Sequence, residues 1–310
     1  MERLLKNFDS TYYWDSYSHF TIHEEMLRDK HRTLTYREAI ARFCPGKVVM
    51  DVGCGTGILS LFAAEVGARR VYAIEMSSIA KEARNVIKAN NYENVITVIN
   101  AQVEDITLPE QVDVIVSEWM GYNLMYENML PSVLNSRRFL VPNGLILPNI
   151  CTLFILAFTG RAEVNRQRKA FESIFGQRPI VDDLLVLEPI VEAIGTDRVV
   201  STHSKVFEFN IATMAAEDVI FRGSFEVHIN KDTVVDGFCC YFDCNFYSKA
   251  FLTTQPGSIT HWKQTLFFLK EPLKCSKNEK ITGIYECCPM KENPRQLDLD
   301  ITYTNRGDPT

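Results

Sequence analysis

The glycine-rich segment at residues 51–57, Asp-Val-Gly-Cys-Gly-Thr-Gly, constrains the fold more than any other part of the chain. An apolar run at 48–52 precedes it and predicts a buried strand, and residues 58–66 predict a helix. Glycine lets the backbone turn tightly and lets a ligand approach closely, because there is no Cβ in the way. A strand, a glycine turn and a helix in this order predict a parallel α/β sheet with a ligand at the carboxyl ends of its strands.

The alternation of strands and helices continues after this unit. Apolar runs at 71–74, 95–99 and 112–116 predict further strands, and Ile79, Ala83 and Ile87 recur at helical spacing after possible N-caps at Ser77 and Ser78. Strands that alternate with helices imply a parallel sheet with right-handed crossovers. Residues 46–150 are therefore predicted to form a Rossmann-like domain, which residues 1–45 precede as mostly helical sequence.

The last part of the chain, residues 151–310, has a different periodicity. Apolar residues alternate with polar ones around Phe225 and Val227 and again from Leu297 to Tyr303, with turn signals between such runs. This pattern predicts an antiparallel sheet that forms a barrel or sandwich. A charged segment at 161–183 is spaced like a helix and predicts a helical insertion.

Composition excludes several classes of protein. The 310 residues carry 33 Lys and Arg against 39 Asp and Glu, a net charge of −6, which argues against a general nucleic-acid binder and fits a basic partner. No apolar stretch is long enough for a membrane helix, and no signal peptide is visible at the N-terminus. Nine cysteines without a CxxC pair predict buried or free thiols in a reducing compartment, with no zinc site or other metal.

Two nucleotide ligands compete for the glycine loop. A dinucleotide fingerprint, GxGxxG, would place its third glycine at position 58, where the chain has Ile58. The observed GxGxG spacing is more typical of S-adenosylmethionine (AdoMet). Glu75, at the end of the next strand, can accept hydrogen bonds from ribose hydroxyls, and Val103 and Glu104 are predicted beside the adenine. The plainer alternative is a loop whose glycines serve geometry alone.

The segment at 117–127, SEWMGYNLMYE, contains two glutamates just past the fourth predicted strand. Gly121 permits a sharp turn that would aim Glu118 and Glu127 into one pocket with apolar walls. Two carboxylates in such a pocket are unfavourable alone, because desolvation and like charge both oppose ionisation. A planar guanidinium between them would relieve both penalties.

This segment closely resembles the double-E loop of protein arginine N-methyltransferases, and four further segments resemble that family in the same order. They are Tyr13-Trp14-Asp15-Ser16-Tyr17, with Trp14 where the family usually has Phe, the segment from His23 to Asp29, the segment from Arg32 to Tyr36, and Thr260-His261-Trp262. The resemblance covers nearly the whole chain and points to the type I group, which forms asymmetric dimethylarginine. It implies an AdoMet-dependent methyltransferase domain with N-terminal helices, and an antiparallel β-barrel or sandwich domain with a helical dimerisation arm at about 161–185.

The resemblance also implies roles for individual residues. Glu118 and Glu127 would grip the guanidinium, and His261 with Asp29 would form a pair that ties the domains together and assists proton removal. The implied cofactor-binding residues are His23, Arg32 (on the cofactor carboxylate), Asp51, Gly53, Gly55, Glu75, Val103, Glu104, Tyr17 and Met26. The implied substrate pocket contains Met26, Met129, Tyr13, Tyr17 and Trp262. Taken singly, most of these side chains could equally be structural.

The implied partners are arginine- and glycine-rich proteins, such as RNA-binding proteins or histones, in the cytoplasm, the nucleus or both, with no direct contact to nucleic acid or membrane. The arm implies a homodimer or hetero-oligomer, although it has no Trp or Tyr and offers Phe171 and Phe175 as anchors. The product of AdoMet would be S-adenosylhomocysteine (AdoHcy). Three alternatives stay open: a regulatory subunit that supports an active paralogue, a small-molecule methyltransferase, and a dinucleotide oxidoreductase.

Overall fold

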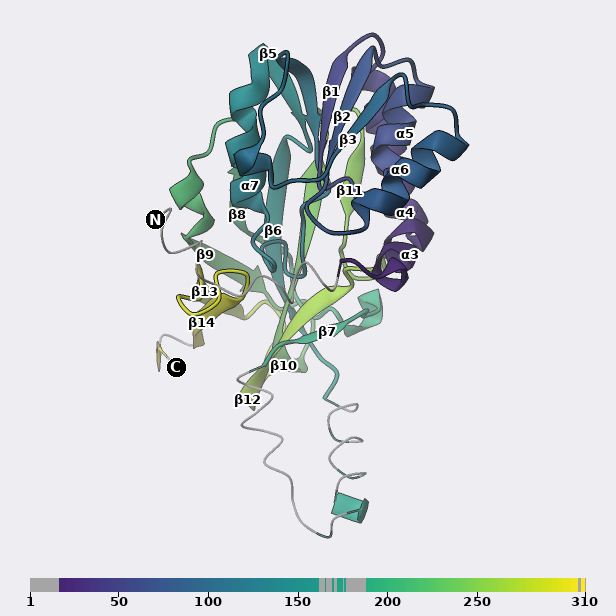
Figure 1. Cartoon of the computed structure of the whole chain (residues 1–310). Coiled ribbons are helices and arrows are strands. Elements are labelled where there is room, and N and C mark those ends of the chain that lie inside the picture. The colour runs from purple at the N-terminus through teal and green to yellow at the C-terminus, as the bar shows by residue number, and fades with distance from the viewer. Residues whose placement is uncertain are drawn as a thin grey trace.

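A computed structural model of the chain describes residues 17–161, 165, 169, 172–174, 176, 188–305 and 308–309. Figure 1 shows an α/β part above a β part, with the described end of the predicted arm lying away from both. Tyr13, Trp14, Phe171 and Phe175 lie outside the described residues. The two parts correspond to the change in periodicity of the sequence near residue 150.

The α/β part is a five-stranded parallel sheet in the order β3-β2-β1-β4-β5. Its strands are β1 (Val48–Val52), β2 (Arg70–Ile74), β3 (Ile96–Ile99), β4 (Val112–Val116) and β5 (Leu140–Leu147). Every residue of β1 is buried, as a central parallel strand requires. The parallel sheet predicted from the sequence is therefore confirmed.

The helices of this part connect its strands and flank the sheet. They are α5 (Ile58–Glu65), α6 (Ala80–Ala89), α7 (Leu130–Ser136) and the short helices η1 (Val103–Asp105) and η2 (Arg137–Phe139). Figure 1 places α5 and α6 on one flank and α7 beside β5 on the other. The predicted serine caps of α6 are wrong, because the helix begins after Ile79 with no side-chain cap. The backbone N–H of Ser77 bonds to the carboxylate of Glu75 instead.

Two N-terminal helices, α3 (Phe20–Arg28) and α4 (Lys30–Phe43), meet at Asp29. Asp29 ends α3 and caps α4, because its side chain accepts a hydrogen bond from the backbone N–H of Arg32 at 2.9 Å. The α4 helix is held by its buried side, where Tyr36 and Ile40 are fully inaccessible to solvent. The turn between these helices thus places Asp29 and Arg32 at a fixed position beside the sheet.

The β part consists of two antiparallel sheets. The first contains β6 (Ile150–Phe158), β7 (Ile190–Glu192), β8 (Ser204–Asn210), β10 (Thr233–Asn245), β11 (Phe251–Thr253) and β12 (Gln264–Cys275). The second contains β9 (Phe221–His228), β13 (Lys280–Pro289), β14 (Leu297–Asn305) and β15 (Asp308–Pro309). Short helices η3 (Thr196–Arg198) and η4 (Ala216–Val219) lie in its loops. The alternation in β9 follows the predicted period, with Phe225 and Val227 buried and Glu226 exposed.

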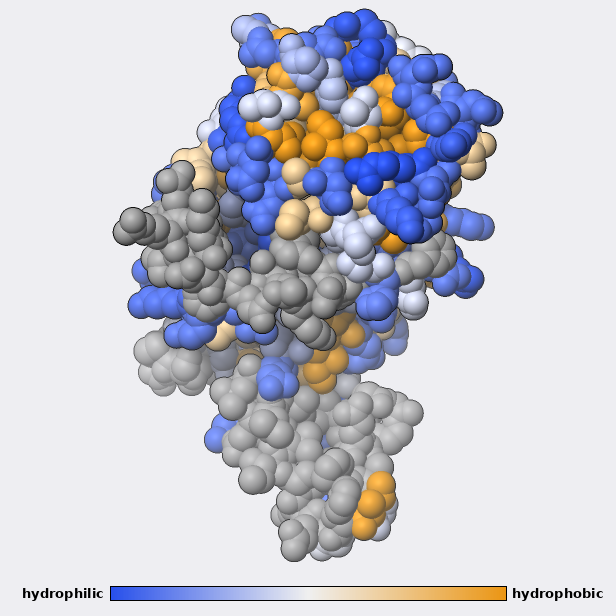
Figure 2. All heavy atoms as spheres, in the orientation of Figure 1, coloured by the Kyte–Doolittle hydropathy of each residue, from blue (hydrophilic) through white to orange (hydrophobic). Residues whose placement is uncertain are grey.

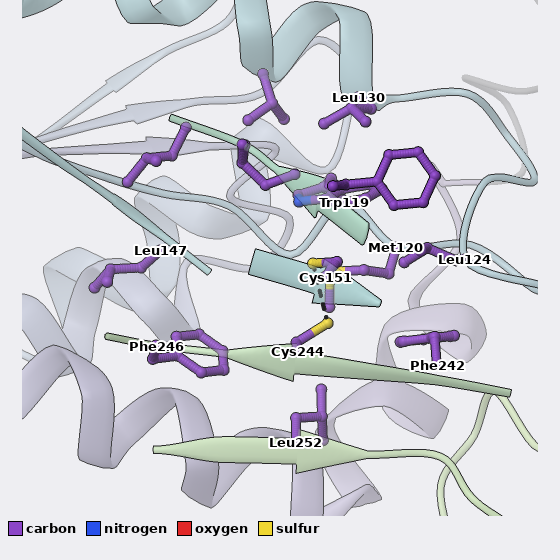
Figure 3. Close-up of a cluster of buried hydrophobic side chains, with 14 of the residues drawn as sticks. Trp119, Met120, Leu124, Leu130, Leu147, Cys151, Phe242, Cys244, Phe246 and Leu252 are labelled. Carbon is purple, nitrogen blue, oxygen red and sulfur yellow. Dashed lines mark hydrogen bonds between the residues drawn. The ribbon is translucent and has the colours of Figure 1, made fainter. Parts of the chain in front are cut away.

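One hydrophobic cluster joins the α/β part to the β part (Figure 3). Met120 and Leu124, from the loop after β4, pack with Cys151 of β6 and Cys244 of β10. All nine cysteines are free thiols, and the sulfurs of Cys151 and Cys244 are 3.3 Å apart. Because the cluster is continuous, the loop after β4 is held by both parts of the chain.

Of the predicted helical arm, the structure describes Arg161, Asn165, Lys169, 172–174 and Gly176, and the residues from Asn165 to Ile174 among them are helical. Ile174 is 72% exposed. The visible described surface is mostly polar, with a hydrophobic area over the α/β part between α7 and α6 (Figure 2). Within the described residues, no helix is long and apolar enough to span a membrane, and no group of His, Cys, Asp or Glu is arranged to hold a metal ion.

Candidate functional site

The glycine loop follows β1 in a left-handed backbone conformation. Gly53 has a φ of +75° and Gly55 a φ of +55°. A Cβ on Gly53 would lie 2.5 Å from the terminal carbon of Met129, and a Cβ on Gly55 would lie 3.0 Å from the imidazole of His23. Because they lack a Cβ, these glycines leave room for Met129, which was predicted in the substrate pocket, and for His23, which was predicted at the cofactor. The loop brings these predicted residues together.

The carboxylate of Glu75 faces this loop from the end of β2. One of its oxygens accepts a hydrogen bond from the N–H of Gly55 at 2.9 Å, and the other accepts one from the N–H of Ser77 at 2.7 Å. The side-chain amide of Asn100 bonds to the backbone oxygen of Glu75 at 2.7 Å. Each carboxylate oxygen keeps a further lone pair. Glu75 is thus fixed in place with capacity to accept from a ligand hydroxyl.

Asp51, at the end of β1, is buried with one oxygen satisfied. Its Oδ2 accepts from the hydroxyl of Ser60 at 2.7 Å, and its Oδ1 has no partner among the described residues. Burial raises the pKa of Asp51 to about 7, and the nearby Glu75 adds to this rise. An unpaired buried acceptor beside a glycine loop fits a ligand with a hydrogen-bond donor. The loop, Glu75 and Asp51 together fit a nucleoside with an attached amino acid, such as AdoMet.

The turn predicted beside the adenine is the short helix η1. Val103 is buried within it and Glu104 is exposed. The guanidinium of Arg138 donates to the backbone oxygens of Val103 at 2.9 Å and Glu104 at 3.0 Å. Arg138 therefore orients the turn. Sequence reasoning missed it, because a side chain that bonds to backbone oxygens leaves no motif.

Glu118 lies at the carboxyl end of β4, at the edge where parallel sheets bind ligands. Two hydrogen bonds fix the residue before it, Ser117. The Ser117 hydroxyl donates to the backbone oxygen of Val52 at 2.7 Å, and the Tyr36 hydroxyl donates to the backbone oxygen of Ser117 at 2.9 Å. The carboxylate of Glu118 pairs with the guanidinium of Arg32 at 2.7 Å, and each side chain is only 7% exposed. Arg32 was assigned to the cofactor carboxylate. The structure pairs Arg32 with Glu118, which gives this buried carboxylate the charge partner that it needs, and the assignment to the cofactor stays a prediction.

Glu127, at the other end of the same loop, has a left-handed backbone with a φ of +73°. Its carboxylate accepts a hydrogen bond from the hydroxyl of Tyr17 at 2.6 Å. The backbone oxygen of Tyr17 lies 2.9 Å from Nε2 of His23. The structure therefore gathers Tyr17, His23 and Glu127, which were predicted separately, at one place.

The loop between the two glutamates is the tight turn that the sequence indicated. The N–H of Gly121 bonds to the oxygen of Leu124 at 3.0 Å. A Cβ on Gly121 would lie 1.9 Å from the backbone oxygen of Tyr126, so no other residue fits there. The side-chain amide of Asn123 donates to the hydroxyl of Tyr285 in β13 at 2.5 Å. The β part of the chain thus holds the turn from outside.

Asp29 and His261 join the N-terminal helices to the β part. The Oδ2 of Asp29 accepts from the backbone N–H of His261 at 2.9 Å and from its Nδ1 at 2.8 Å. Burial works to raise the pKa of Asp29, but the bonds from His261 and from the N–H of Arg32 outweigh it and leave that pKa lowered. An ionised Asp29 favours a proton on Nδ1 of His261, and in that tautomer of the neutral imidazole Nε2 is the acceptor.

Trp262 and Met26 were both predicted to line the substrate pocket. Trp262 is 3% exposed and donates from its ring nitrogen to the backbone oxygen of Met120 at 2.7 Å. The centroid of its ring lies 4.0 Å from that of His261, and it supports the loop from Glu118 to Glu127 through the bond to Met120; its place in the substrate pocket stays a prediction. Met26 is half-buried, and its backbone oxygen accepts from Arg32 at 3.3 Å.

A separate apolar groove of about 360 Å³ lies on the outer side of the glycine loop. Residues from α3, the glycine loop, α5 and α6 line it, and they are Leu27, Thr56, Ile58, Leu61, Glu82 and Val86. Neither paired glutamate contributes to it. Because Thr56 belongs to the glycine loop, the groove and the candidate cofactor site share one wall.

Models of two protein families match the two parts of the chain. Residues 154–308 match the model of the arginine methyltransferase oligomerization subdomain. Residues 34–146 match the model of the ribosomal protein L11 methyltransferase. The boundary between these matches falls where the parallel sheet ends and the antiparallel sheets begin.

Relatives and solved structures match nearly the whole chain. Protein arginine N-methyltransferase 1 of Chlamydomonas reinhardtii is 42% identical over 307 residues, which cover 96% of this chain and 89% of the relative. The protein of the same name from Caenorhabditis elegans is 40% identical over 310 residues, with 96% and 89% covered. The Trypanosoma brucei protein arginine methyltransferase 1 enzyme–prozyme heterotetrameric complex with AdoHcy superposes with a TM-score of 0.89 at 36% identity, covering 94% of this chain and 95% of that one.

Proposed function

Because this chain belongs to the protein arginine methyltransferase family and is an AdoMet-dependent enzyme of its type I group, we propose that Glu118 and Glu127 bind the guanidinium of the acceptor arginine. The observation that carries this proposal is that both carboxylates already bind donors of the chain itself, a guanidinium and a hydroxyl. The guanidinium of Arg32 pairs with the carboxylate of Glu118 at 2.7 Å, and the hydroxyl of Tyr17 donates to the carboxylate of Glu127 at 2.6 Å. Both carboxylates therefore already act as hydrogen-bond acceptors, and the one on Glu118 already binds a guanidinium.

The reaction is a direct transfer in which alignment and electrostatics supply the catalysis. AdoMet supplies an electrophilic methyl group on a sulfonium, and AdoHcy is its product. Glu118 and Glu127 draw the positive charge of the guanidinium toward the nitrogens that they bind, so the remaining nitrogen keeps more of its lone pair. His261, with its Nδ1 proton held by Asp29 at 2.8 Å, offers Nε2 to receive a proton after transfer.

The cofactor is held by the loop and the carboxylates around it. Gly53 and Gly55 allow the close approach, Glu75 accepts from the ribose, and Asp51 offers its unpaired Oδ1 to a donor. Arg32 binds the cofactor carboxylate with the part of its donor fork that Glu118 leaves available. The remaining residues of the proposed cofactor site are His23, Val103, Glu104, Tyr17 and Met26.

The size of the methyl-accepting pocket determines the product. Met129 packs against Gly53, and Met26 lies beside Arg32. Both side chains are unbranched and flexible, so they leave room for monomethylarginine to bind again in one orientation. The products are then monomethylarginine and asymmetric dimethylarginine.

The acceptors are arginine- and glycine-rich segments of basic proteins, such as RNA-binding proteins or histones, in the cytoplasm, the nucleus or both. The net charge of −6 favours such partners. The chain carries an oligomerization subdomain, and the arm at about 161–185 joins it to a second copy or to a related subunit. Ile174 on the arm is 72% exposed, and the groove lined by Leu61 and Val86 is the apolar surface that a partner's arm would cover.

The experiment that tests this function is a methyl-transfer assay on the purified chain. Labelled AdoMet and an arginine- and glycine-rich peptide serve as substrates, with an Arg→Lys peptide as the control and light scattering to give the mass of the active species. Transfer to the arginine peptide alone, with loss of the oligomer in Ile174→Glu, supports the proposal. Binding of AdoMet without transfer would instead favour a regulatory subunit or a small-molecule acceptor.

A further inference from the structure

We propose that Arg295 is a positioning residue that holds Glu127 in its acceptor-binding conformation, an inference that rests on the proposed role of Glu127. Arg295 bonds to both backbone groups of Glu127. The N–H of Glu127 donates to the backbone oxygen of Arg295 at 2.9 Å, and Nη1 of Arg295 donates to the backbone oxygen of Glu127 at 2.9 Å. These two bonds fix the orientation of the peptide groups on either side of the Glu127 Cα.

The backbone of Glu127 needs such support. Its φ of +73° lies in the left-handed region, which is unfavourable for a residue with a Cβ. Asn128 follows with a φ of +47°, so the chain is held in this region over two successive residues. Left-handed residues of this kind persist only where the surrounding structure determines them. Loss of one bond of the pair would release Glu127 toward ordinary backbone conformations and move its carboxylate.

The turn that carries Arg295 is itself fixed. It spans residues 290–296, between β13 and β14. The N–H of Gln296 bonds to the backbone oxygen of Asn293 at 2.9 Å, and the N–H of Met290 bonds to the oxygen of Gln296 at 3.0 Å. The side chain of Asn128 adds a third link, because its amide donates to the backbone oxygen of Pro294 at 2.9 Å.

This contact gives the turn a function that its sequence does not reveal. One glutamate of the pair, Glu118, is set by β4 and Arg32 within the α/β part and the N-terminal helices. The other, Glu127, is set by the turn between β13 and β14 of the β part. The spacing of the two carboxylates therefore depends on how the two parts are joined, and Arg295 is the side chain that transmits this dependence to Glu127.

The test compares Arg295→Ala and Arg295→Lys with the wild-type chain. We expect kcat on the arginine peptide to fall about 10- to 100-fold in Arg295→Ala, as for a small misplacement of a binding group. The affinity for AdoHcy should stay within about twofold of wild type, because the two bonds described above join Arg295 to Glu127 and not to the glycine loop. Arg295→Lys can still donate to the oxygen of Glu127, so it should recover several-fold of the lost activity. If Arg295→Ala does not fold, the test rests on Arg295→Lys. Its kcat should then be lower than that of wild type, while its affinity for AdoHcy stays unchanged.

Arg222→Ala is the matched control. Arg222 is an exposed arginine whose guanidinium pairs with Glu286 at 3.5 Å on the same sheet. Its variant should keep wild-type kcat. Wild-type kcat in Arg295→Ala, an equal loss in Arg295→Lys and Arg295→Ala, or a parallel loss of AdoHcy affinity would each overturn the proposal.

A second comparison separates this inference from the proposed function. In a Glu127→Gln background, Arg295→Ala should cause little further loss of kcat, because Arg295 acts through Glu127. A full additional loss would show that Arg295 acts elsewhere and would overturn the inference. Wild-type activity in Glu127→Gln alone would overturn the proposed role of Glu127 itself, whatever Arg295→Ala does.

Discussion

Arg32 and Glu118 form a buried ion pair at the centre of the candidate site. The guanidinium approaches the carboxylate with Nη2 at 2.7 Å and with Nε at 2.9 Å, and each side chain is 7% exposed. The N–H of Arg32 is fixed by Asp29 at 2.9 Å, so the position of the pair follows from the turn between α3 and α4. The turn that caps α4 therefore also places the guanidinium against Glu118.

The first prediction concerns this pair. Arg32→Met leaves Glu118 buried without a counter-charge, which should lower the free energy of unfolding by about 3–5 kcal/mol. The double variant Arg32→Met with Glu118→Gln should recover much of this loss, because it removes the second charge as well. Urea unfolding of wild type, Arg32→Met, Glu118→Gln and the double variant gives the coupling free energy between the two side chains. Equal stabilities for Arg32→Met and the double variant would contradict the prediction.

The second prediction concerns Asp51 and pH. Burial raises the pKa of Asp51 from 3.8 to about 7 in the folded chain. The unfolded chain releases this proton first as pH rises, so the contribution of Asp51 to folding stability should fall between about pH 4 and pH 7 and level off above. A rise of this size corresponds to roughly 4 kcal/mol.

Asp51→Asn removes the titrating group and keeps an oxygen for the hydroxyl of Ser60. The stability of the variant relative to wild type should therefore increase from pH 4 to pH 7. Urea unfolding of both proteins at a series of pH values measures this difference. A difference that stays constant across the range would show that Asp51 does not titrate there.

The third prediction compares two left-handed glycines. Gly53 has a φ of +75° and Gly46 a φ of +72°, so alanine strains both backbones alike. A Cβ on Gly53 would meet Met129 at 2.5 Å, whereas a Cβ on Gly46 would have no neighbour within 4 Å. Gly53→Ala should therefore weaken AdoHcy binding by about tenfold or more, while Gly46→Ala should lose only about 1–2 kcal/mol of stability. Calorimetric titration with AdoHcy distinguishes the two, and equal affinities would contradict the assignment of the loop.

The sequence predicted those features that depend on local patterns. The strand Val112–Val116, the glycine loop and the turn at Gly121 each follow from periodicity or from the steric properties of glycine within a short segment. The pair of Asp29 and His261 followed from the resemblance, and its geometry is present at 2.8 Å. The strand, the loop and the turn need no knowledge of how distant segments pack, whereas the pair of Asp29 and His261 joins segments 232 residues apart and was reached only through the resemblance.

The features that the sequence did not predict depend on contacts between distant segments. Arg138 and Arg295 use guanidinium groups to bond to backbone oxygens, and backbone oxygens are present at every residue. Arg32 had two possible partners of the same charge, and only the fold could show that Glu118 lies within reach. The bond from the ring nitrogen of Trp262 to the backbone oxygen of Met120 was not predicted either, because it joins segments that are 142 residues apart in the sequence.

The last prediction concerns the proposed proton acceptor. His261→Gln should lower kcat by about 100-fold or more, the usual contribution of a positioned acid or base. Asp29 can still accept from the backbone N–H of residue 261 at 2.9 Å, so the two parts of the chain stay joined and AdoHcy should bind as in wild type. His203→Gln is the matched control, because the Nδ1 of His203 lies 2.8 Å from the Tyr241 hydroxyl, outside the site. The initial rate with saturating AdoMet and peptide measures the effect. A loss of AdoHcy affinity that matches the loss of kcat would show that His261 acts by joining the two parts, whereas a selective loss of kcat assigns it to the chemical step.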